Sequence, residues 1–186
     1  MSAVPGQTVG PFFHLGLAYP LMNELVAPGD PKAVRLHGHV YDGAGAPVPD
    51  AVLEIWQADP QGVVPRQPGS LRRDGWTFTG WGRAATDPDG HYQFFTCEPG
   101  ATDPGKAPFF AVTVFARGLM DRLFTRAYLP DTPELASDPL LTTIAPDRSH
   151  TLITRREPGG LVFDVRLQGE DETVFLTYPR LRDAWA

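Results

Sequence analysis

The alternation of hydrophobic and polar residues is clearest near residue 40 of the chain. In the stretch Val34–Tyr41, every second position is apolar or small, namely Val34, Leu36, Gly38 and Val40. The positions between them hold arginine, two histidines and tyrosine. An alternation with period two is typical of a strand that buries one face and leaves the other in water. The pattern therefore predicts a strand over 34–41.

The residues that follow predict a turn and a second strand. Residues 42–47 read Asp-Gly-Ala-Gly-Ala-Pro. Glycine tolerates positive φ, and proline fixes φ and cannot donate to a ladder. Residues 52–57 are mostly β-branched, aliphatic or aromatic, as strands prefer. We expect the two strands to form a hairpin that ends at the turn residues 59–62.

The rest of the chain repeats this rhythm of short strands and turns. Further strands are expected at 91–96, 109–116, 122–129, 150–155, 160–168 and 173–178. Residues 109–116 are apolar enough to be buried on both faces, and 150–155 and 160–168 are expected to pair as a hairpin. The best helix candidate is 132–141, with Thr132 as N-cap and Pro133 at the first helical position. Pro139 indicates that this helix is short or broken.

Composition supports the same fold class. The 186 residues include 19 Gly and 20 Pro, yet 42% are hydrophobic, so these residues punctuate short strands rather than disorder the chain. We predict an all-β sandwich with long loops and one short helix. It forms a single domain over 32–186, preceded by an N-terminal arm over 1–31. The arm is rich in aromatic residues, which cover either its own domain or a partner.

Charge and cysteine content narrow the function. The formal net charge is −6 without any run of Lys or Arg, which argues against a nucleic-acid partner. An anionic substrate would need a local arginine. The single cysteine, Cys97, allows no internal disulfide and is read as a buried thiol. With neither a leader-like N-terminus nor an 18-residue apolar run, we expect a cytoplasmic protein without a membrane span.

Few residues carry a chemical signature of their own. His37 and His39 share one strand face and could bind a metal, but no carboxylate or cysteine stands near them in the sequence, and a solvated face also explains them. Asp87 and Asp89 lack the rest of a calcium loop and are read as turn formers. Arg126 lies in mid-strand among apolar residues. It is either a solvated side chain or a bidentate partner for a carboxylate.

Five stretches taken together resemble the intradiol ring-cleavage dioxygenases. They are residues 7–16, 36–59, 82–94, 114–129 and 163–175, which span almost the whole chain. The resemblance implies a β-sandwich enzyme subunit that works on an aromatic dihydroxybenzoate and O₂. It also implies a ferric ion held by two tyrosines and two histidines, a ligand set that suits hard Fe(III).

The ligand positions that the resemblance implies are not filled by ligands here. Val63 and Val64 stand where the first tyrosine is expected, residues 101–102 are Ala-Thr where the second is expected, and residues 108–110 are Pro-Phe-Phe where the histidine pair is expected. This pattern is that of the family's iron-free α-type subunit. It implies no metal and no catalytic residue in this chain, and a β subunit that carries the iron in a higher-order α/β oligomer.

The resemblance also implies a substrate-binding role for four residues. Thr8, Gly10 and Pro11 of the arm would line the aromatic substrate, and Arg126 would hold its carboxylate. Two alternatives stay open. One is a ligand-binding or structural β-sandwich without catalysis, and the other is a homo-oligomeric intradiol dioxygenase that assembles iron from His37, His39 and a tyrosine.

Overall fold

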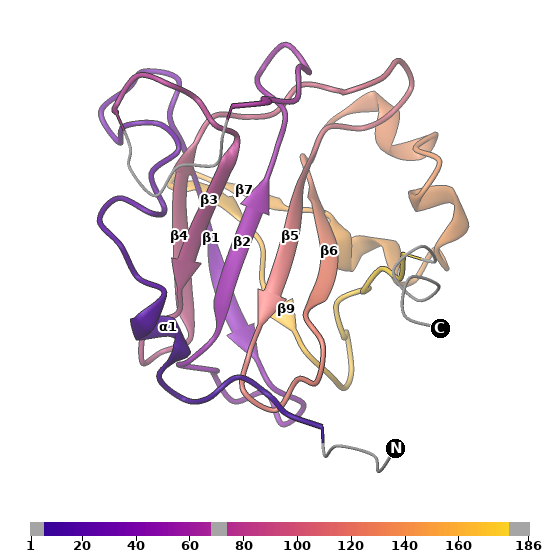
Figure 1. Ribbon diagram of the computed structural model, residues 1–186. Coiled ribbons are helices and arrows are strands. Elements are labelled where there is room, and N and C mark those ends of the chain that lie inside the picture. Colours follow the sequence, from indigo (N-terminus) through magenta and orange to yellow (C-terminus); the bar gives the residue numbers. More distant parts are fainter. Residues whose placement is uncertain (1–5, 68–73, 179–186) are drawn as a thin grey trace, which may run out of the picture.

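Two β-sheets packed face to face form the centre of the structure (Figure 1). The computed structural model describes residues 6–67 and 74–178. One sheet has the order β4-β1-β8-β7, with β9 also paired to β1, and the other has the order β3-β2-β5-β6. The predicted all-β sandwich is confirmed. The strands are β1 (Val34–Tyr41), β2 (Val52–Trp56), β3 (Trp81–Ala85), β4 (His91–Thr96), β5 (Phe109–Phe115), β6 (Leu123–Tyr128), β7 (Arg155–Glu157), β8 (Gly160–Val162) and β9 (Val165–Arg166).

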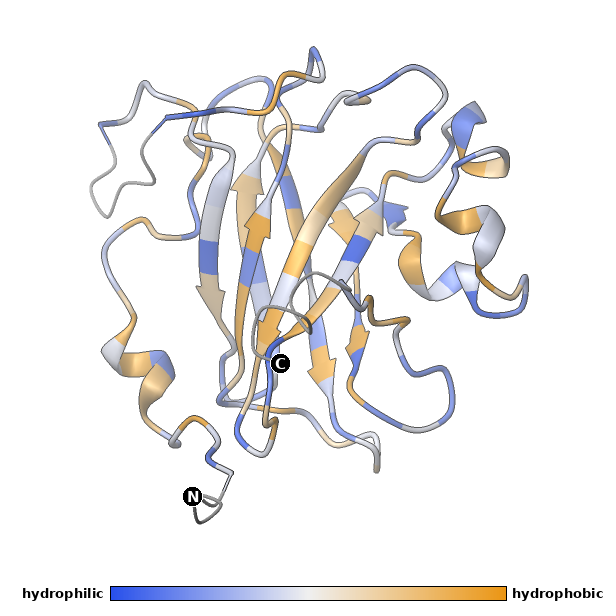
Figure 2. Ribbon diagram, turned by 45° about the vertical axis from the view of Figure 1, so that its right-hand side comes forward, coloured by the Kyte–Doolittle hydropathy of each residue, from blue (hydrophilic) through white to orange (hydrophobic). Residues whose placement is uncertain are grey.

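A single apolar core fills the space between the sheets. Leu36 and Phe94 from one sheet and Leu53 and Val114 from the other are all fully buried in it. Figure 2 shows that hydrophobic residues concentrate on the strands, whereas much of the connecting loops is hydrophilic. In β1 the buried positions alternate with half-buried ones, as the sequence predicted. The hydrophobic effect therefore joins the two sheets through their facing sides.

The predicted hairpin between β1 and β2 is wrong, because the two strands belong to different sheets. The chain does turn tightly after β1. The Asp42 carboxylate accepts hydrogen bonds from the backbone N–H groups of Ala44 and Ala46, and Tyr41 bridges to Pro47. The backbone N–H of Val48 still donates to the carbonyl of Val40, and the chain then crosses to the other sheet before β2. In that sheet β2 lies between β3 and β5.

The predicted helix over 132–141 is replaced by two short 3-10 helices, η1 (Pro133–Ala136) and η2 (Leu141–Thr143). Pro133 does take the first helical position, but the Thr132 side chain makes no capping hydrogen bond. The break comes at Pro139. The preceding residue, Asp138, caps the next turn by accepting the backbone N–H groups of Leu140 and Leu141. The one α-helix of the described residues, α1 (Phe13–Gly16), lies in the arm.

The C-terminal third departs most from the predicted strands. Residues 149–152 form a third 3-10 helix, η3 (Ser149–Leu152), so only the end of the stretch 150–155 is extended. The hairpin around residues 157–160 is confirmed, since β7 and β8 pair there. Residues 173–178 form no strand. Thr173 and Leu176 donate single backbone hydrogen bonds to Arg166 and Phe124 without a ladder.

The two halves of the arm behave differently. Its second half pairs with the sandwich, because Leu25 and Val26 donate to the carbonyl of Phe95 and Met22 accepts from Arg83. In its first half, the described residues 6–16 are mostly exposed, and α1 has no buried residue. The arm's boundary at residue 31 and its packing on a partner stay predictions.

A close backbone approach next to β1 gives a test of this packing. A Cβ added at Gly38 would lie 2.0 Å from the carbonyl oxygen of Phe163, so Gly38→Ala must push these segments apart. We expect a loss of about 1–3 kcal/mol in the free energy of unfolding, as for an overpacked core. Urea denaturation measures the change. Gly159→Ala, with open space around its Cβ, is the control, and an equal effect of both variants would contradict the packing described here.

Candidate functional site

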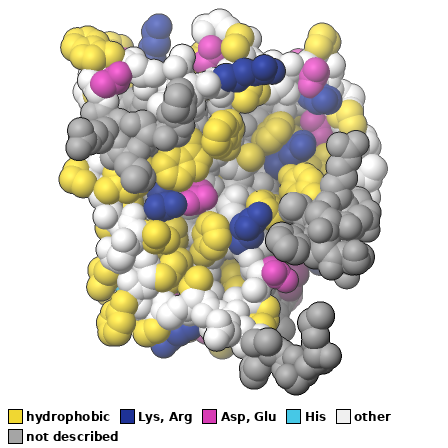
Figure 3. Space-filling model, in the orientation of Figure 1, with side chains coloured by type: hydrophobic (Ala, Val, Ile, Leu, Met, Phe, Trp, Pro, Cys, Tyr) yellow, Lys and Arg dark blue, Asp and Glu magenta, His cyan; other side chains and the backbone are white. Residues whose placement is uncertain are grey.

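The outer face of the four-stranded sheet is unusually apolar. The strand register places Trp81, Trp56, Ala111 and Arg126 side by side in one row across its four strands. Trp56 is 43% exposed. Figure 3 views this face and shows hydrophobic side chains across its centre, interrupted by an adjacent pair of basic and acidic side chains. The expectation that β5 is buried on both faces is met only on its inner face, since its outward residues are half-buried.

A salt bridge lies on the same face, at the β3 edge. Arg83 donates to a carboxylate oxygen of Glu54 at 2.6 Å, and both side chains are largely shielded from solvent. A second guanidinium nitrogen of Arg83 donates to the carbonyl of Leu17 at 3.3 Å. This contact joins the arm to the edge of the sheet. Because Arg83 and Glu54 have opposite charges, this pair of strand positions near Trp81 and Trp56 has no net charge.

The opposite edge of this face, at β6, is covered by residues 133–152, the 3-10 segment, which contains η1, η2 and η3. A second apolar cluster forms there around Tyr128, Leu141 and Leu152, with Phe109 packed against it. The phenol of Tyr128 is fully buried, and burial raises its pKa to about 12. The hydroxyl therefore keeps its proton at any physiological pH. The outer face thus has a covered end, at β6 under the 3-10 segment, and an open end around Trp56.

Arg126 lies at the boundary between these two ends. Its guanidinium carbon stands 4.0 Å from the ring centre of Phe109, in a cation–π arrangement. Its Nη1 donates a hydrogen bond to the hydroxyl of Tyr128 at 3.0 Å. The residue is half-buried. An arginine held in this way presents a fixed positive charge next to an apolar, aromatic surface.

The Tyr128 hydroxyl that accepts from Arg126 also donates a hydrogen bond to Asp138. It donates to Oδ1 of Asp138 at 3.1 Å, and the carboxylate is 1% exposed. The same carboxylate accepts from the backbone N–H groups of Ala107, Leu140 and Leu141. Four donors therefore satisfy this buried anion, as burial of a charge requires.

The arm residues predicted to bind substrate lie elsewhere on the molecule. The Thr8 hydroxyl accepts the backbone N–H of Gly118 at 2.8 Å, just past the end of β5, and borders a small cavity of about 350 Å³. Gly10 and Pro11 are exposed. Arg126 instead pairs with Ala111, near the start of β5. The structure does not bring Arg126 together with Thr8, and their roles toward a substrate stay predictions.

The positions where the resemblance implied iron ligands hold no suitable donors. Val63 and Val64 border a cleft of about 900 Å³ between the arm and the loop that follows β2. The loop containing Ala101 packs against this one, since its carbonyl lies 2.0 Å from a Cβ added at Gly62. Cys97 borders the same cleft. Its burial raises the pKa of the thiol, which fits the predicted buried cysteine.

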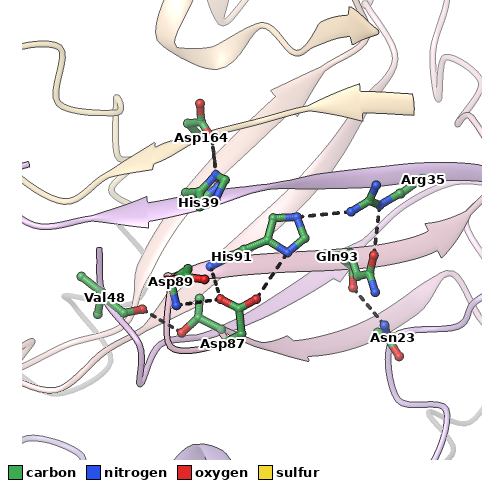
Figure 4. A network of polar contacts seen from close by, with 10 residues as sticks. Asn23, Arg35, His39, Val48, Asp87, Asp89, His91, Gln93 and Asp164 are labelled. Atoms are coloured by element: carbon green, nitrogen blue, oxygen red, sulfur yellow. Dashed lines mark hydrogen bonds and ion pairs between the residues drawn. The ribbon is translucent and has the colours of Figure 1, made fainter. Parts of the chain in front are cut away.

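His37 and His39 join a polar network on the outer face of the other sheet. Both rings lie close to that of His91 on β4, with ring centres 5.6 Å apart for His37 and 5.1 Å apart for His39. Figure 4 shows His39 and His91 with their polar neighbours. Burial and the nearby cation Arg35 lower the pKa of His37 and His91. Asp87 accepts the backbone N–H groups of Asp89 and His91, as expected of a turn former. The charged and polar groups that face the three rings are Arg35, Asp87, Gln93 and Asp164.

The described residues contain neither a metal-binding group of side chains nor a helix that could span a membrane. In residues 6–67 and 74–178, no three or more His, Cys, Asp or Glu side chains are grouped so as to hold a metal ion. In the same residues, no helix has the length and apolar character needed to cross a bilayer.

Comparison with known proteins identifies the family. Residues 21–109 match the family described as Dioxygenase. The chain is 39% identical to the protocatechuate 3,4-dioxygenase alpha chain of Burkholderia cepacia, over 94% of this chain and 97% of that one. The chain belongs to the intradiol ring-cleavage dioxygenase family. It is also 32% identical to the protocatechuate 3,4-dioxygenase beta chain of the same organism, over 90% of this chain and 76% of that one.

Solved structures agree with this intradiol dioxygenase assignment. The dioxygenase domain of a carbohydrate-binding fusion protein from Streptomyces sp. SirexAA-E is 28% identical, with a TM-score of 0.60. The match covers 89% of this chain and 97% of that one.

Intradiol dioxygenases depend on iron in general, but the residues at the implied ligand positions of this chain do not fit a ferric ion. The expected tyrosinate and imidazole positions carry hydrocarbon side chains, apart from Thr102, whose hydroxyl donates to the neighbouring Asp103. Hydrocarbon offers Fe(III) no ligand. At the start of β5 the Arg126 cation lies over Phe109, and a second cation there would be repelled.

Tyr128 and Asp138 carry no functional signature of their own in the sequence. The sequence pattern predicts only a strand at Tyr128 and the interior of a helix at Asp138. The pair Asp138-Pro139 was the available signal, because aspartate before proline favours a cap or turn rather than a helix interior.

The histidine network predicts a pH dependence of stability. Because the folded state lowers the pKa of His37 and His91, the unfolded chain binds protons more readily. Stability is therefore complete above the unfolded pKa of about 6.5 and falls as the pH drops below it. We expect the urea midpoint to fall between pH 7.5 and 5.5, and to fall less in His91→Gln. His150→Gln, at an exposed position, is the control; an identical fall in His91→Gln and the parent would contradict this account.

Proposed function

We propose that this chain is the iron-free α subunit of a protocatechuate 3,4-dioxygenase. The holoenzyme cleaves protocatechuate with O₂ between its two hydroxyl-bearing carbons and yields 3-carboxy-cis,cis-muconate. A β subunit carries the Fe(III), which supplies the chemistry of ring cleavage. The observation that carries the proposal is 39% identity to an alpha chain over 94% of this chain, combined with the absence of tyrosine and histidine at the implied ligand positions.

The contribution of this chain is to bind and orient the substrate. Protocatechuate carries a carboxylate, and a guanidinium pairs with carboxylates through two parallel hydrogen bonds. Arg126 is already fixed by Phe109 and Tyr128 at the rim of the open end of the outer face. The partner that holds the substrate must then cover that open end. Its apolar surface, including the half-exposed Trp56, suits a protein contact and would exclude water from the substrate.

The arm completes the pocket in this proposal. Thr8, Gly10 and Pro11 line the aromatic ring of the substrate, and residues 1–31 lie across the β subunit while residues 32–186 form the sandwich domain. Phe12 is 74% and Leu15 63% exposed, which leaves apolar side chains for a partner to cover. Because the first half of the arm buries so little of its own surface, moving it toward Arg126 on assembly costs little.

Iron content tests the division of labour between the subunits. We expect the purified chain to be colourless and inactive, because it lacks tyrosinate and imidazole donors at the implied positions. Co-expression with the β subunit should yield a complex with iron, activity and the visible tyrosinate-to-iron absorption. Iron assay and a visible spectrum check this. Tight iron binding by the chain alone would instead favour the homo-oligomeric dioxygenase, and an arm deletion without kinetic effect in the complex would favour a non-catalytic module.

The role of Arg126 has its own test in the co-purified complex. We expect Arg126→Ala to raise the KM for protocatechuate by about tenfold or more, since a charged hydrogen-bonded pair is lost. The KM for catechol, which has no carboxylate, should hardly change. Arg166→Ala is the matched control, because Arg166 also stacks on an aromatic ring, that of Tyr41, but in the other sheet. Equal changes for both substrates would remove Arg126 from this role.

A further inference from the structure

Three side chains, those of Arg126, Tyr128 and Asp138, form a continuous series of hydrogen bonds. Nη1 of Arg126 donates to the Tyr128 hydroxyl, and this hydroxyl donates to Oδ1 of Asp138. Tyr128 is fully buried and Asp138 is 1% exposed, whereas Arg126 is half-buried. This series of hydrogen bonds therefore runs from the open face of the sheet into the apolar cluster under the 3-10 segment.

From this geometry we propose that Tyr128 and Asp138 are positioning residues that hold the Arg126 guanidinium in the orientation needed to bind the substrate carboxylate. The inference rests on the proposed function and adds two residues to it. Neither residue touches the substrate. Both act through Arg126, and so they belong to substrate specificity rather than to the chemistry of ring cleavage.

The direction of each hydrogen bond supports this assignment. Asp138 is held by three backbone N–H groups, so its position is set by the backbone and not by Arg126. An ionised carboxylate accepts only, so the phenol must point its proton toward Asp138. The oxygen lone pairs of Tyr128 then face Nη1 of Arg126. The phenol can serve the arginine only as an acceptor, and this fixes one edge of the guanidinium.

This arrangement leaves most N–H donors of the Arg126 guanidinium for the substrate. A guanidinium has five N–H donors, and Tyr128 takes one of them. A direct ion pair with Asp138 would occupy two donors and neutralise the charge. The intervening phenol instead holds the arginine without neutralising it. Phe109 restrains the flat face of the same group, 4.0 Å away. Two independent contacts thus restrain a long side chain and reduce the rotamer entropy that substrate binding must overcome.

The same contacts have a plain structural interpretation, in which Tyr128 simply fills the second apolar cluster. That interpretation predicts a loss of stability without any change in substrate preference. Tyr128→Phe separates the two, because it keeps the ring in the cluster and removes only the hydroxyl. Tyr92→Phe is the matched control. Tyr92 is also buried, and its hydroxyl donates to the backbone carbonyl of Phe163 in the core between the sheets.

The experiment compares steady-state kinetics of the co-purified α–β complex on protocatechuate and on catechol. We expect Tyr128→Phe to raise the KM for protocatechuate by about fivefold, as for one lost hydrogen bond, with kcat and the KM for catechol nearly unchanged. Asp138→Asn should shift the ratio of the two KM values in the same direction. In an Arg126→Ala background, Tyr128→Phe should add nothing, because the two residues act as one unit. Tyr92→Phe should leave the ratio as it is.

The outcomes separate this inference from the proposal on which it rests. If Arg126→Ala changes the ratio and Tyr128→Phe does not, the positioning role is overturned and the proposed function stands. A Tyr128→Phe effect that is equal on both substrates, or that adds fully to Arg126→Ala, also overturns it. If Arg126→Ala leaves the ratio unchanged, the carboxylate role of the arginine fails, and with it the role of Tyr128.

Discussion

The apolar contact between the two sheets is the interaction on which the rest of the structure depends. Because the inner faces supply most of the core, the outer faces are free to carry different chemistry. One outer face carries histidines and aspartates, and the other carries tryptophans, phenylalanines and a few arginines. A sandwich of this kind needs no metal to hold its sheets together. The loss of ligand residues in a subunit can therefore leave the fold intact.

Charge is handled differently on the two sides of the apolar outer face. Arg83 and Glu54 form a salt bridge, and so this part of the sheet presents no net field. Arg126 and Asp138 are held apart by a phenol, which leaves the arginine able to attract an anion. In a protein with a net charge of −6, such a local cation opposes the overall field, as the role proposed for Arg126 requires. The Tyr128 hydroxyl therefore separates Arg126 from Asp138, so that Asp138 does not neutralise the charge of Arg126.

The alternation of residues predicted the strands far better than it predicted their partners. The span of β4 follows from local pattern, since burial of one face needs only period two. The sheet that each strand joins depends on distant segments, and Pro47 was not enough to show that the chain leaves the first sheet. The candidate site likewise has one part that local sequence predicts and one that depends on distant segments. Arg126 stood out as a cation in an apolar strand, but the link to Asp138 could not be foreseen, because it requires the 3-10 segment to fold back over β6.

The pairing of β1 has a consequence for how the protein is made. β1 is complete once residue 41 has been synthesised, yet two of its neighbours in the sheet are β8 and β9, and Val40 pairs with Val165 near the end of the chain. Such contacts between distant residues slow folding, because a long loop must close first. The five-stranded sheet therefore cannot close until most of the polypeptide has left the ribosome. Until then one edge of β1 lacks its strand partners, and such an unpaired edge favours aggregation of the nascent protein.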